Sequence, residues 1–358
     1  MNKRSVVAAA ALLLSGCALH PVPEDVTGVD TYHIVRQIRC ETRQAAAEFV
    51  IKELRRLATE GGDQIAARIV ADYDENPETI SNFNPAVFRG TNYARVRDLY
   101  NVIYTTGIAY NFDLTMTEDN NLGASADFLA PWATSSFTLG LGGNADRQRA
   151  NERVFTITDT VGALLMNLST PIRGERYCDG QLRGPNYIYP IAGHIGVDKM
   201  VQAFFELVLL ADLSAPDKGT PPTMADKLTF TTLVDLTLTP KVVFSPVKSG
   251  FQTSDASLTG VARRTDVHKV TVGLAVEPKQ AAALASLRTY LFSKERNAGS
   301  APVSRSVAIT GVAGALTPRL GVIQANTLTA TAGSQAEQLA IVAVDQLKSR
   351  EIQLVPNP

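Results

Sequence analysis

Two stretches of this sequence alternate between apolar and polar residues. Between Ile108 and Thr117 the even positions are apolar and most odd positions are polar, and the run from Leu228 to Thr239 repeats this pattern with few exceptions. Successive side chains of a β-strand point to opposite faces, so each run predicts a strand with one dry face. A chain with such strands must form a sheet that covers that face, and an antiparallel sheet suits this one-sided burial.

Shorter runs of strand character extend the predicted sheet to about eight strands. A polar loop over 143–149 is predicted to join two of them, and Arg263–Asp266 is predicted to be a hairpin turn. The predicted strands are 106–117, 135–142, 153–159, 228–239, 256–262, 268–276, 303–312 and 321–330.

Helical periodicity dominates the first hundred residues and recurs between the strands. Asp30 or Thr31 is positioned to cap the first helix, and Ser334 with Glu337 forms a capping box for the last one. The predicted helices are 30–57, 62–72, 93–104, 197–210, 279–292 and 334–348. The fold class expected is therefore α+β, with an N-terminal helical segment packed on antiparallel sheet and further helices interspersed.

The order of the elements suggests how the chain is divided. A long strand, a hairpin with a basic turn and a helix occur at 106–168 and again at 227–292. This order predicts two related halves, 106–225 and 226–358, after a helical segment over 30–105. Antiparallel α+β folds also repeat such elements without duplication, so both interpretations stand.

The N-terminus has the features of a secretory signal. Lys3 and Arg4 precede a short apolar run, Val6–Leu14, which is too short to cross a bilayer. Leu14-Ser15-Gly16-Cys17 follows directly and resembles the lipobox of bacterial lipoproteins. An ordinary signal peptide with an incidental cysteine is the alternative.

The resemblance to bacterial lipoproteins has specific implications. Residues 1–16 would be removed as a signal peptide and Cys17 would be lipidated, with 17–29 as a proline-bearing tether. The following residue is Ala18 rather than Asp, which in that family implies export to the outer membrane. The implied location is the outer membrane, lipid-anchored and facing the periplasm.

The remaining cysteines are Cys40 and Cys178. An even number of cysteines in an oxidising compartment predicts one disulfide between them. Two separate buried thiols are the alternative, because free cysteine is often buried.

Composition excludes some functions. Lys and Arg number 34 against 35 Asp and Glu, whereas nucleic-acid binders normally carry a basic excess. The alternating strands have the length seen in outer-membrane proteins whose sheet closes on itself. However, aromatic residues make up only 7%, the chain ends Pro-Asn-Pro rather than in an aromatic strand, and helices are interspersed, which together argue against a membrane barrel.

The search for catalytic chemistry finds few candidates. His194 lies in a glycine-flanked loop before the helix at 197–210, where functional groups are often placed, although such a histidine is commonly a turn residue. Ser245 and Lys248 match S-x-x-K without the accompanying motifs of penicillin-recognising enzymes. The glycine-rich stretch 140–145 is not followed by a helix, and 72–83 lacks the glycine and glutamate of a calcium loop. No metal site, cofactor or catalytic residue is predicted.

Basic residues of the two predicted turns form a candidate site for an anionic ligand. Arg147, Arg149, Arg263 and Arg264 would all lie there, with solvated turn charge as the plainer alternative. The function expected is an accessory or scaffold lipoprotein of an envelope assembly, attached to the membrane by lipid and to an envelope protein partner. The alternatives are a lipoprotein that binds a lipid, glycan or small anion, and an envelope hydrolase that uses His194.

Overall fold

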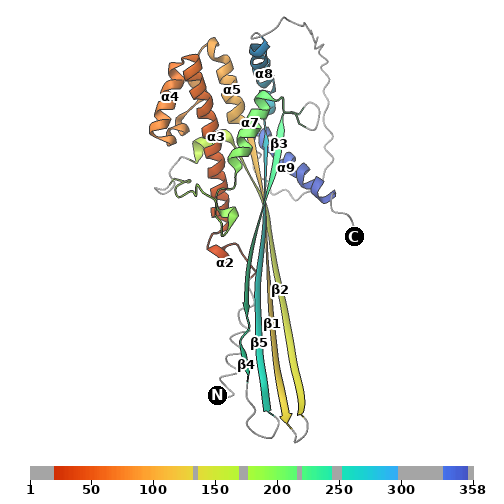
Figure 1. Ribbon diagram of the computed structural model, residues 1–358. Coiled ribbons are helices and arrows are strands. Elements are labelled where there is room, and N and C mark those ends of the chain that lie inside the picture. The colour runs from red at the N-terminus through yellow and green to blue at the C-terminus, as the bar shows by residue number, and fades with distance from the viewer. Residues whose placement is uncertain are drawn as a thin grey trace.

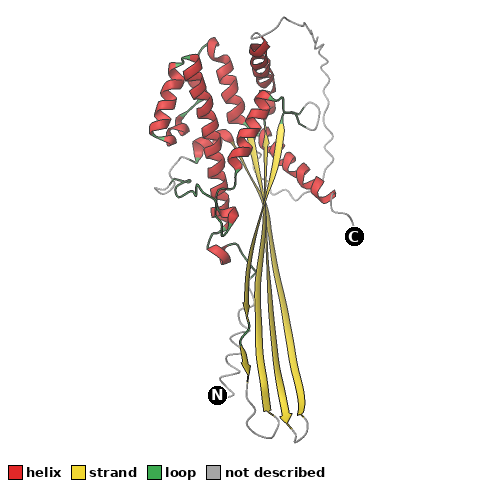
Figure 2. Cartoon of the chain, in the orientation of Figure 1, coloured by secondary structure: helices red, strands yellow, loops and turns green. Residues whose placement is uncertain are grey.

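The computed structural model describes residues 20–131, 136–168, 176–215, 220–243, 252–296 and 334–353. A helical head lies at one end, and a long, narrow sheet runs through it and projects far beyond it (Figure 1). Helices and strands together make up nearly all of what is described (Figure 2). The α+β fold class is confirmed.

The six predicted helices are present in place and order, and the structure adds the short helices α2 (Glu24–Thr27) and α6 (Val161–Asn167). The predicted ones are α3 (Thr31–Gly61), α4 (Gln64–Glu75), α5 (Ala94–Thr105), α7 (Val197–Leu210), α8 (Ala281–Arg296) and α9 (Gln335–Gln353). Asp30 is the cap of α3, because its side chain accepts a hydrogen bond from the His33 amide at 2.8 Å. Ser334 and Glu337 form the predicted capping box of α9. Among the described helices, none is both long and apolar enough to cross a bilayer.

The strands are far longer than predicted. They are β1 (Gly107–Pro131), β2 (Ser136–Thr160), β3 (Thr223–Leu238), β4 (Lys241–Val243) and β5 (Gln252–Ala275). All pairs are antiparallel and the order is β2-β1-β5-β3, with β4 beside β5. Strands of 25 residues extend for about 80 Å.

The predicted loop at 143–149 and the predicted turn at Arg263–Asp266 are both wrong. The first lies inside β2 and the second inside β5, and both pair without interruption with β1. Glycine and charged residues favour a turn when no partner strand bonds to their backbone groups, but here β1 supplies those hydrogen bonds. Glu118 of β1 also pairs with the charges of Arg149 and Arg264. The predicted strands 303–312 and 321–330 lie outside the described residues.

β3 and β4 act as one edge strand. The register that pairs Leu238 with Gly260 also pairs Val242 with Ala256, and between them the Leu258 amide donates to the Pro240 carbonyl at 3.1 Å. Pro240 has no amide to return this bond, so one bond of the ladder to β5 is missing where β3 ends and β4 begins. Both predicted halves therefore contribute to a single sheet, in which β1 pairs with β5.

The head buries both faces of the upper sheet. On one face, even-numbered residues of β1 such as Tyr110, Phe112 and Leu114 pack with α3 and α7, where Phe49 stacks on Phe205. On the other face, α9 lies against Ala109 and Ala275 through Ala340 and Val344. Small residues there let the helix approach closely. The apolar face that the alternation predicted is thus confirmed for this part of β1.

A disulfide joins Cys40 of α3 to Cys178, as the cysteine count predicted. The two residues are 138 apart in the sequence. In the chain-entropy model, closing a loop of this length stabilises the fold by roughly 5 kcal/mol. The bond attaches the segment after residue 176 to the long first helix.

The contact between α9 and the sheet yields a stability prediction. A Cβ at Gly273 would lie 2.4 Å from the Ala340 carbonyl oxygen, whereas a Cβ at Gly260 of the same strand meets nothing within 4 Å. We expect Gly273→Ala to lower the free energy of unfolding by about 1–3 kcal/mol, because the α9 backbone must shift. Gly260→Ala is the matched control and is expected to be near neutral in urea denaturation. Equal effects of the two changes would contradict this packing.

Candidate functional site

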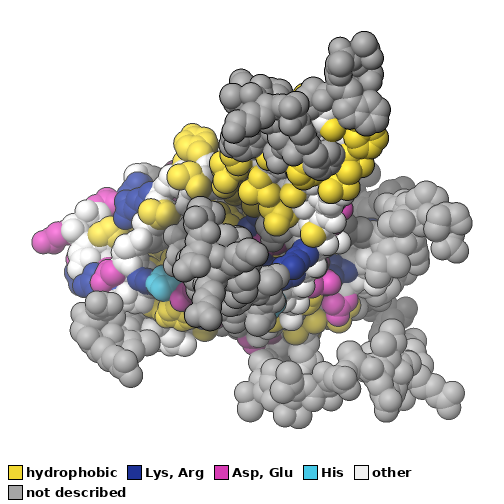
Figure 3. All heavy atoms as spheres, turned by 90° about the horizontal axis from the view of Figure 1, so that it is seen from below, with side chains coloured by type: hydrophobic (Ala, Val, Ile, Leu, Met, Phe, Trp, Pro, Cys, Tyr) yellow, Lys and Arg dark blue, Asp and Glu magenta, His cyan; other side chains and the backbone are white. Residues whose placement is uncertain are grey.

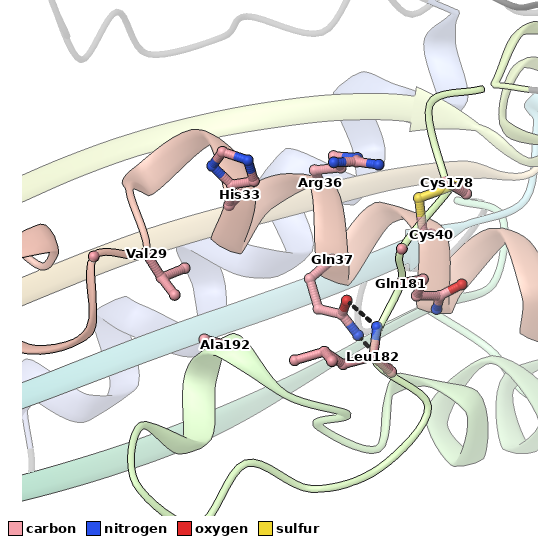
Figure 4. Close-up of a pocket in the computed structure, with 11 residues that line it drawn as sticks. Val29, His33, Arg36, Gln37, Cys40, Cys178, Gln181, Leu182 and Ala192 are labelled. Atoms are coloured by element: carbon pink, nitrogen blue, oxygen red, sulfur yellow. Dashed lines mark hydrogen bonds between the residues drawn. A yellow bond between two sulfur atoms is a disulfide. The ribbon is translucent and has the colours of Figure 1, made fainter. Parts of the chain in front are cut away.

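A cavity of about 310 Å³ lies beside the disulfide, between the start of α3 and the segment 178–182 (Figure 4). Two of its polar side chains, Gln37 and Arg36, are engaged with the backbone. Gln37 donates to the Leu182 carbonyl at 2.6 Å and accepts from the Leu182 amide at 2.9 Å. Arg36 donates to the carbonyls of Tyr177 and Asp179. These bonds fasten the segment to α3, so the cavity offers few polar groups to a ligand.

His194 lies where the sequence placed it, in the loop before α7. Its Nδ1 is 3.5 Å from Glu41 of α3 and its Nε2 is 3.5 Å from Asp198 of α7. Among the described residues, these three lie close enough together to share a metal ion. Sequence reasoning missed Glu41, which is 153 positions from His194.

Glu41 has a structural role that accounts for its burial. Its carboxylate is 2% exposed and accepts the backbone amides of Ile195, Gly196 and Val197 at 2.9, 2.7 and 2.6 Å. A negative charge that accepts several amides at a helix start stabilises the helix through hydrogen bonds and through its dipole. The geometry is that of a cap for α7, and His194 lies beside the cap beyond hydrogen-bond distance.

A second polar cluster holds the N-terminal segment against the sheet. Arg264 of β5 donates to Asp266, to the Val22 carbonyl at 2.6 Å, and to Asp25 and Glu118 at 3.3 Å. Two further bonds complete the cluster: Asn151 donates to the Pro21 carbonyl at 3.0 Å and Arg149 to Glu118 at 2.8 Å. We call this set, Pro21, Val22, Asp25, Glu118, Arg149, Asn151 and Arg264, the clamp.

The clamp changes two interpretations of the sequence. Residues Pro21–Thr27, expected as part of an extended tether, lie against the sheet and include the short helix α2. Arg149 and Arg264 contact carboxylates, so an anion there would have to displace Glu118. The strand register places Arg147 on the face that carries Arg149 and Arg264, but nearer the tip. Arg263 lies on the opposite face, 4.0 Å from Asp235.

Behind the clamp lies a buried group of Tyr189, Asp266 and His268. The Tyr189 hydroxyl is 2.5 Å from His268 Nε2 and donates to Asp266 at 3.2 Å. Burial lowers the pKa of His268 to about 4, although nearby Asp266 opposes this. Burial also raises the pKa of Tyr189, and Asp266 adds to that rise. His268 is thus neutral at physiological pH, and it packs against Tyr189 in the interior behind the clamp.

Beyond the clamp the sheet continues as a structure that we call the blade: residues 120–131, 136–147, 236–243 and 252–262. The helices do not cover it, and the described part of β2 from Ser136 to Gln148 is exposed throughout. Hydrophobic side chains gather along one side of the molecule when it is seen from the tip (Figure 3). Large apolar residues of the blade that are 39–59% exposed are Leu122, Phe137, Leu139, Leu141, Leu236, Leu238 and Leu258.

The register places all seven of these residues on one face. Leu122 faces Ala145 on β2 and Gly260 on β5, and Gly260 in turn faces Leu238 on β3. This apolar face continues the face that is buried under α3 and α7 in the head. An exposed apolar surface of this extent marks a site of contact with a partner or a membrane.

Comparison with known proteins shows which family the chain belongs to. A family model described as "Uncharacterised protein y4kA" matches residues 20–354. The chain belongs to this family. A relative named "Uncharacterized protein y4kA", from Sinorhizobium fredii (strain NBRC 101917 / NGR234), is 32% identical over 284 residues, covering 78% of this chain and 84% of the relative. The match to the y4kA family includes both the head and the blade. Cys17 lies outside the described residues, so its lipidation remains a prediction.

The cap on α7 yields a prediction that separates Glu41 from His194. Glu41→Gln removes the charge and one acceptor, so we expect the free energy of unfolding to fall by about 2 kcal/mol. His194→Ala removes no hydrogen bond from the cap and is expected to cost less than about 1 kcal/mol. Urea denaturation at pH 7 measures both, with exposed Glu48→Gln as control. A loss at His194→Ala as large as at Glu41→Gln would show that the histidine is part of the cap.

The buried histidine yields a pH prediction. The folded pKa of about 4 lies below the unfolded value of about 6.5, so the unfolded chain binds the proton more readily. The stability that neutral His268 contributes is complete above pH 6.5 and is lost as the pH falls toward 4, by about 2 kcal/mol at pH 5. His268→Gln should lose this part of the pH dependence, and exposed His20→Gln should keep it. Identical pH profiles for the two variants would contradict the assignment.

Proposed function

We propose that this protein is an outer-membrane lipoprotein that serves as a structural subunit of an envelope assembly built from several copies of the chain. The proposal combines the predicted lipid anchor with one observation: a sheet that leaves its own core with open edges. β2 and the β3–β4 strand each have a partner on only one side in the described structure. Long exposed edges of this kind pair readily with other strands.

The direction of the strands supports pairing between copies. β1 and β3 run from the head toward the tip, while β2 and β5 run back. Consequently β2 of one copy is antiparallel to β3 of the next when the two molecules stand side by side. Such a head-to-tail contact can repeat until it closes into a ring.

The backbone pattern identifies which groups the outer edge offers. Because Leu258 donates to Pro240, even-numbered residues of the edge strand bond to β5 and odd-numbered residues direct their amide and carbonyl outward. Thr237 is therefore an outward position, and its amide is available to a neighbouring β2. Proline there removes one donor from the outer edge and leaves the inner ladder intact.

The native mass of the full-length lipidated protein tests the proposal. Extracted in a mild detergent, the wild-type protein should migrate at a multiple of the mature chain mass. Thr237→Pro should shift it toward a single chain, because a donor of the intermolecular ladder is lost, while Thr237→Val keeps the donor and should behave as wild type. Cross-linking in intact membranes before extraction provides a check against dissociation. Migration of the cross-linked wild-type protein at one chain mass would overturn the proposal.

A further inference from the structure

The two faces of the blade differ in chemistry. Between the clamp and the tip, the apolar face carries Leu, Ala, Phe and Gly on β1 and β2 with no charge from Leu122 to Phe128. The opposite face carries Asp127, Asp146, Asp255 and Lys241, of which the last two form an ion pair at 2.7 Å. Leu129 and Val243 are the large apolar residues on that polar side near the tip.

The polar face is also hollowed. A shallow depression of about 390 Å³ lies on the blade, and polar or small residues line it. Ser125 and Ser257 share a hydrogen bond at 2.7 Å within it. Residues of the polar face that line the hollow are Gly123, Ser125, Gly142, Asn144, Ser257 and Thr259.

The height of the uncharged apolar face matches a bilayer. Residues 122–131 of β1 and 136–145 of β2 provide about ten residues per strand, and a tilted membrane strand needs about 9–11. Arg147 lies on the same face one row nearer the head, at the level expected for lipid headgroups. The sequence therefore changes from charged to apolar over the distance at which a membrane would begin.

The clamp holds the start of the described chain a few residues nearer the head than Arg147. Pro21 is bonded to Asn151, opposite Met116, and Val22 to Arg264, opposite Glu118. From there to Leu122 is about 14–20 Å along the strand. Cys17 precedes Pro21 by four residues, which span up to about 14 Å. Acyl chains on Cys17 would thus enter a bilayer near the upper limit of the apolar face.

A sheet with open edges cannot lie in lipid, because its unpaired backbone groups would lose their hydrogen bonds to water. The strand directions described above remove this obstacle when copies pair edge to edge. Each copy then supplies the strand order β2-β1-β5-β3, and the combined sheet remains antiparallel throughout.

Building on the proposed function, we propose that the blades of several copies cross the outer membrane together as one closed cylinder of antiparallel strands. The apolar face contacts the acyl chains, and the polar face, with Asp127, Asp255 and Lys241, lines a water-filled channel for ions and small hydrophilic solutes. Three carboxylates, those of Asp127, Asp146 and Asp255, against one ammonium group per copy make the channel prefer cations.

Thiol labelling tests the orientation of the two faces. Four variants each add one cysteine to the chain: Ala124→Cys and Ser125→Cys occupy adjacent positions on opposite faces, as do Leu139→Cys and Thr138→Cys. In native outer membranes, a hydrophilic maleimide should label Ser125→Cys and Thr138→Cys. It should label Ala124→Cys and Leu139→Cys only after the protein has been denatured in dodecyl sulfate. The wild-type chain, whose Cys40 and Cys178 form a disulfide, is the unlabelled control.

The outcomes separate this inference from the proposed function. Equal labelling of both faces, or protection of both, in a protein that still migrates as an oligomer would overturn the membrane-spanning blade and leave the assembly proposal standing. A protein that migrates as a single chain would overturn both. Alternating labelling in the oligomer supports both.

Conductance in planar lipid bilayers provides an independent readout. The purified lipidated oligomer in a KCl gradient should give a reversal potential of the sign expected for a cation-selective channel. Asp127→Asn should shift that potential toward zero, while Asp72→Asn, an exposed change of the same kind on α4 of the head, should leave it unchanged. Absence of conductance, or equal shifts for the two variants, would overturn the channel.

Discussion

A single register along β1 and β5 connects every part of this molecule. The pairing that begins at Gly107 and Ala275 inside the head continues to Asp127 and Asp255 near the tip before it shifts. Because side chains alternate strictly along a strand, the face that is buried beneath α3 and α7 is necessarily the face that becomes apolar and exposed in the blade. A slip of one residue would exchange the two faces over the whole length. The helices of the head therefore determine which side of the distant blade is apolar.

The clamp forms the boundary between these two parts. Arg264 contacts three carboxylates, those of Asp25, Glu118 and Asp266. On its head side the middle strands β1 and β5 are covered by helices, and on its tip side the sheet is uncovered. Buried ion pairs contribute little net stability, but removal of one partner leaves an uncompensated charge, so such clusters specify an arrangement rather than strengthen it. Here the arrangement specified is the position of the N-terminal segment on the sheet.

Local patterns in the sequence predicted much of the head. Alternation from Ile108 to Thr117, the cap at Asp30 and the pairing of Cys40 with Cys178 each depend on properties of neighbouring residues or on the number of cysteines. The length of β2 and β5 depends on partners far away. Gly143 and Arg263 are residue types that favour turns, and they are part of strands because each pairs with β1. Glu41 escaped notice for the same reason, since its role as cap of α7 arises from a contact between distant segments.

The clamp also sets an order in which parts of the molecule can form. It joins Val22 to Arg264, residues 242 positions apart, so it cannot form until the chain has been made through most of β5. Before that point the segment that begins at Pro21 has no Arg264 to bind. If the chain carries the proposed lipid anchor, its distance from the membrane would be variable while it folds, and completion of β5 would then fix that distance.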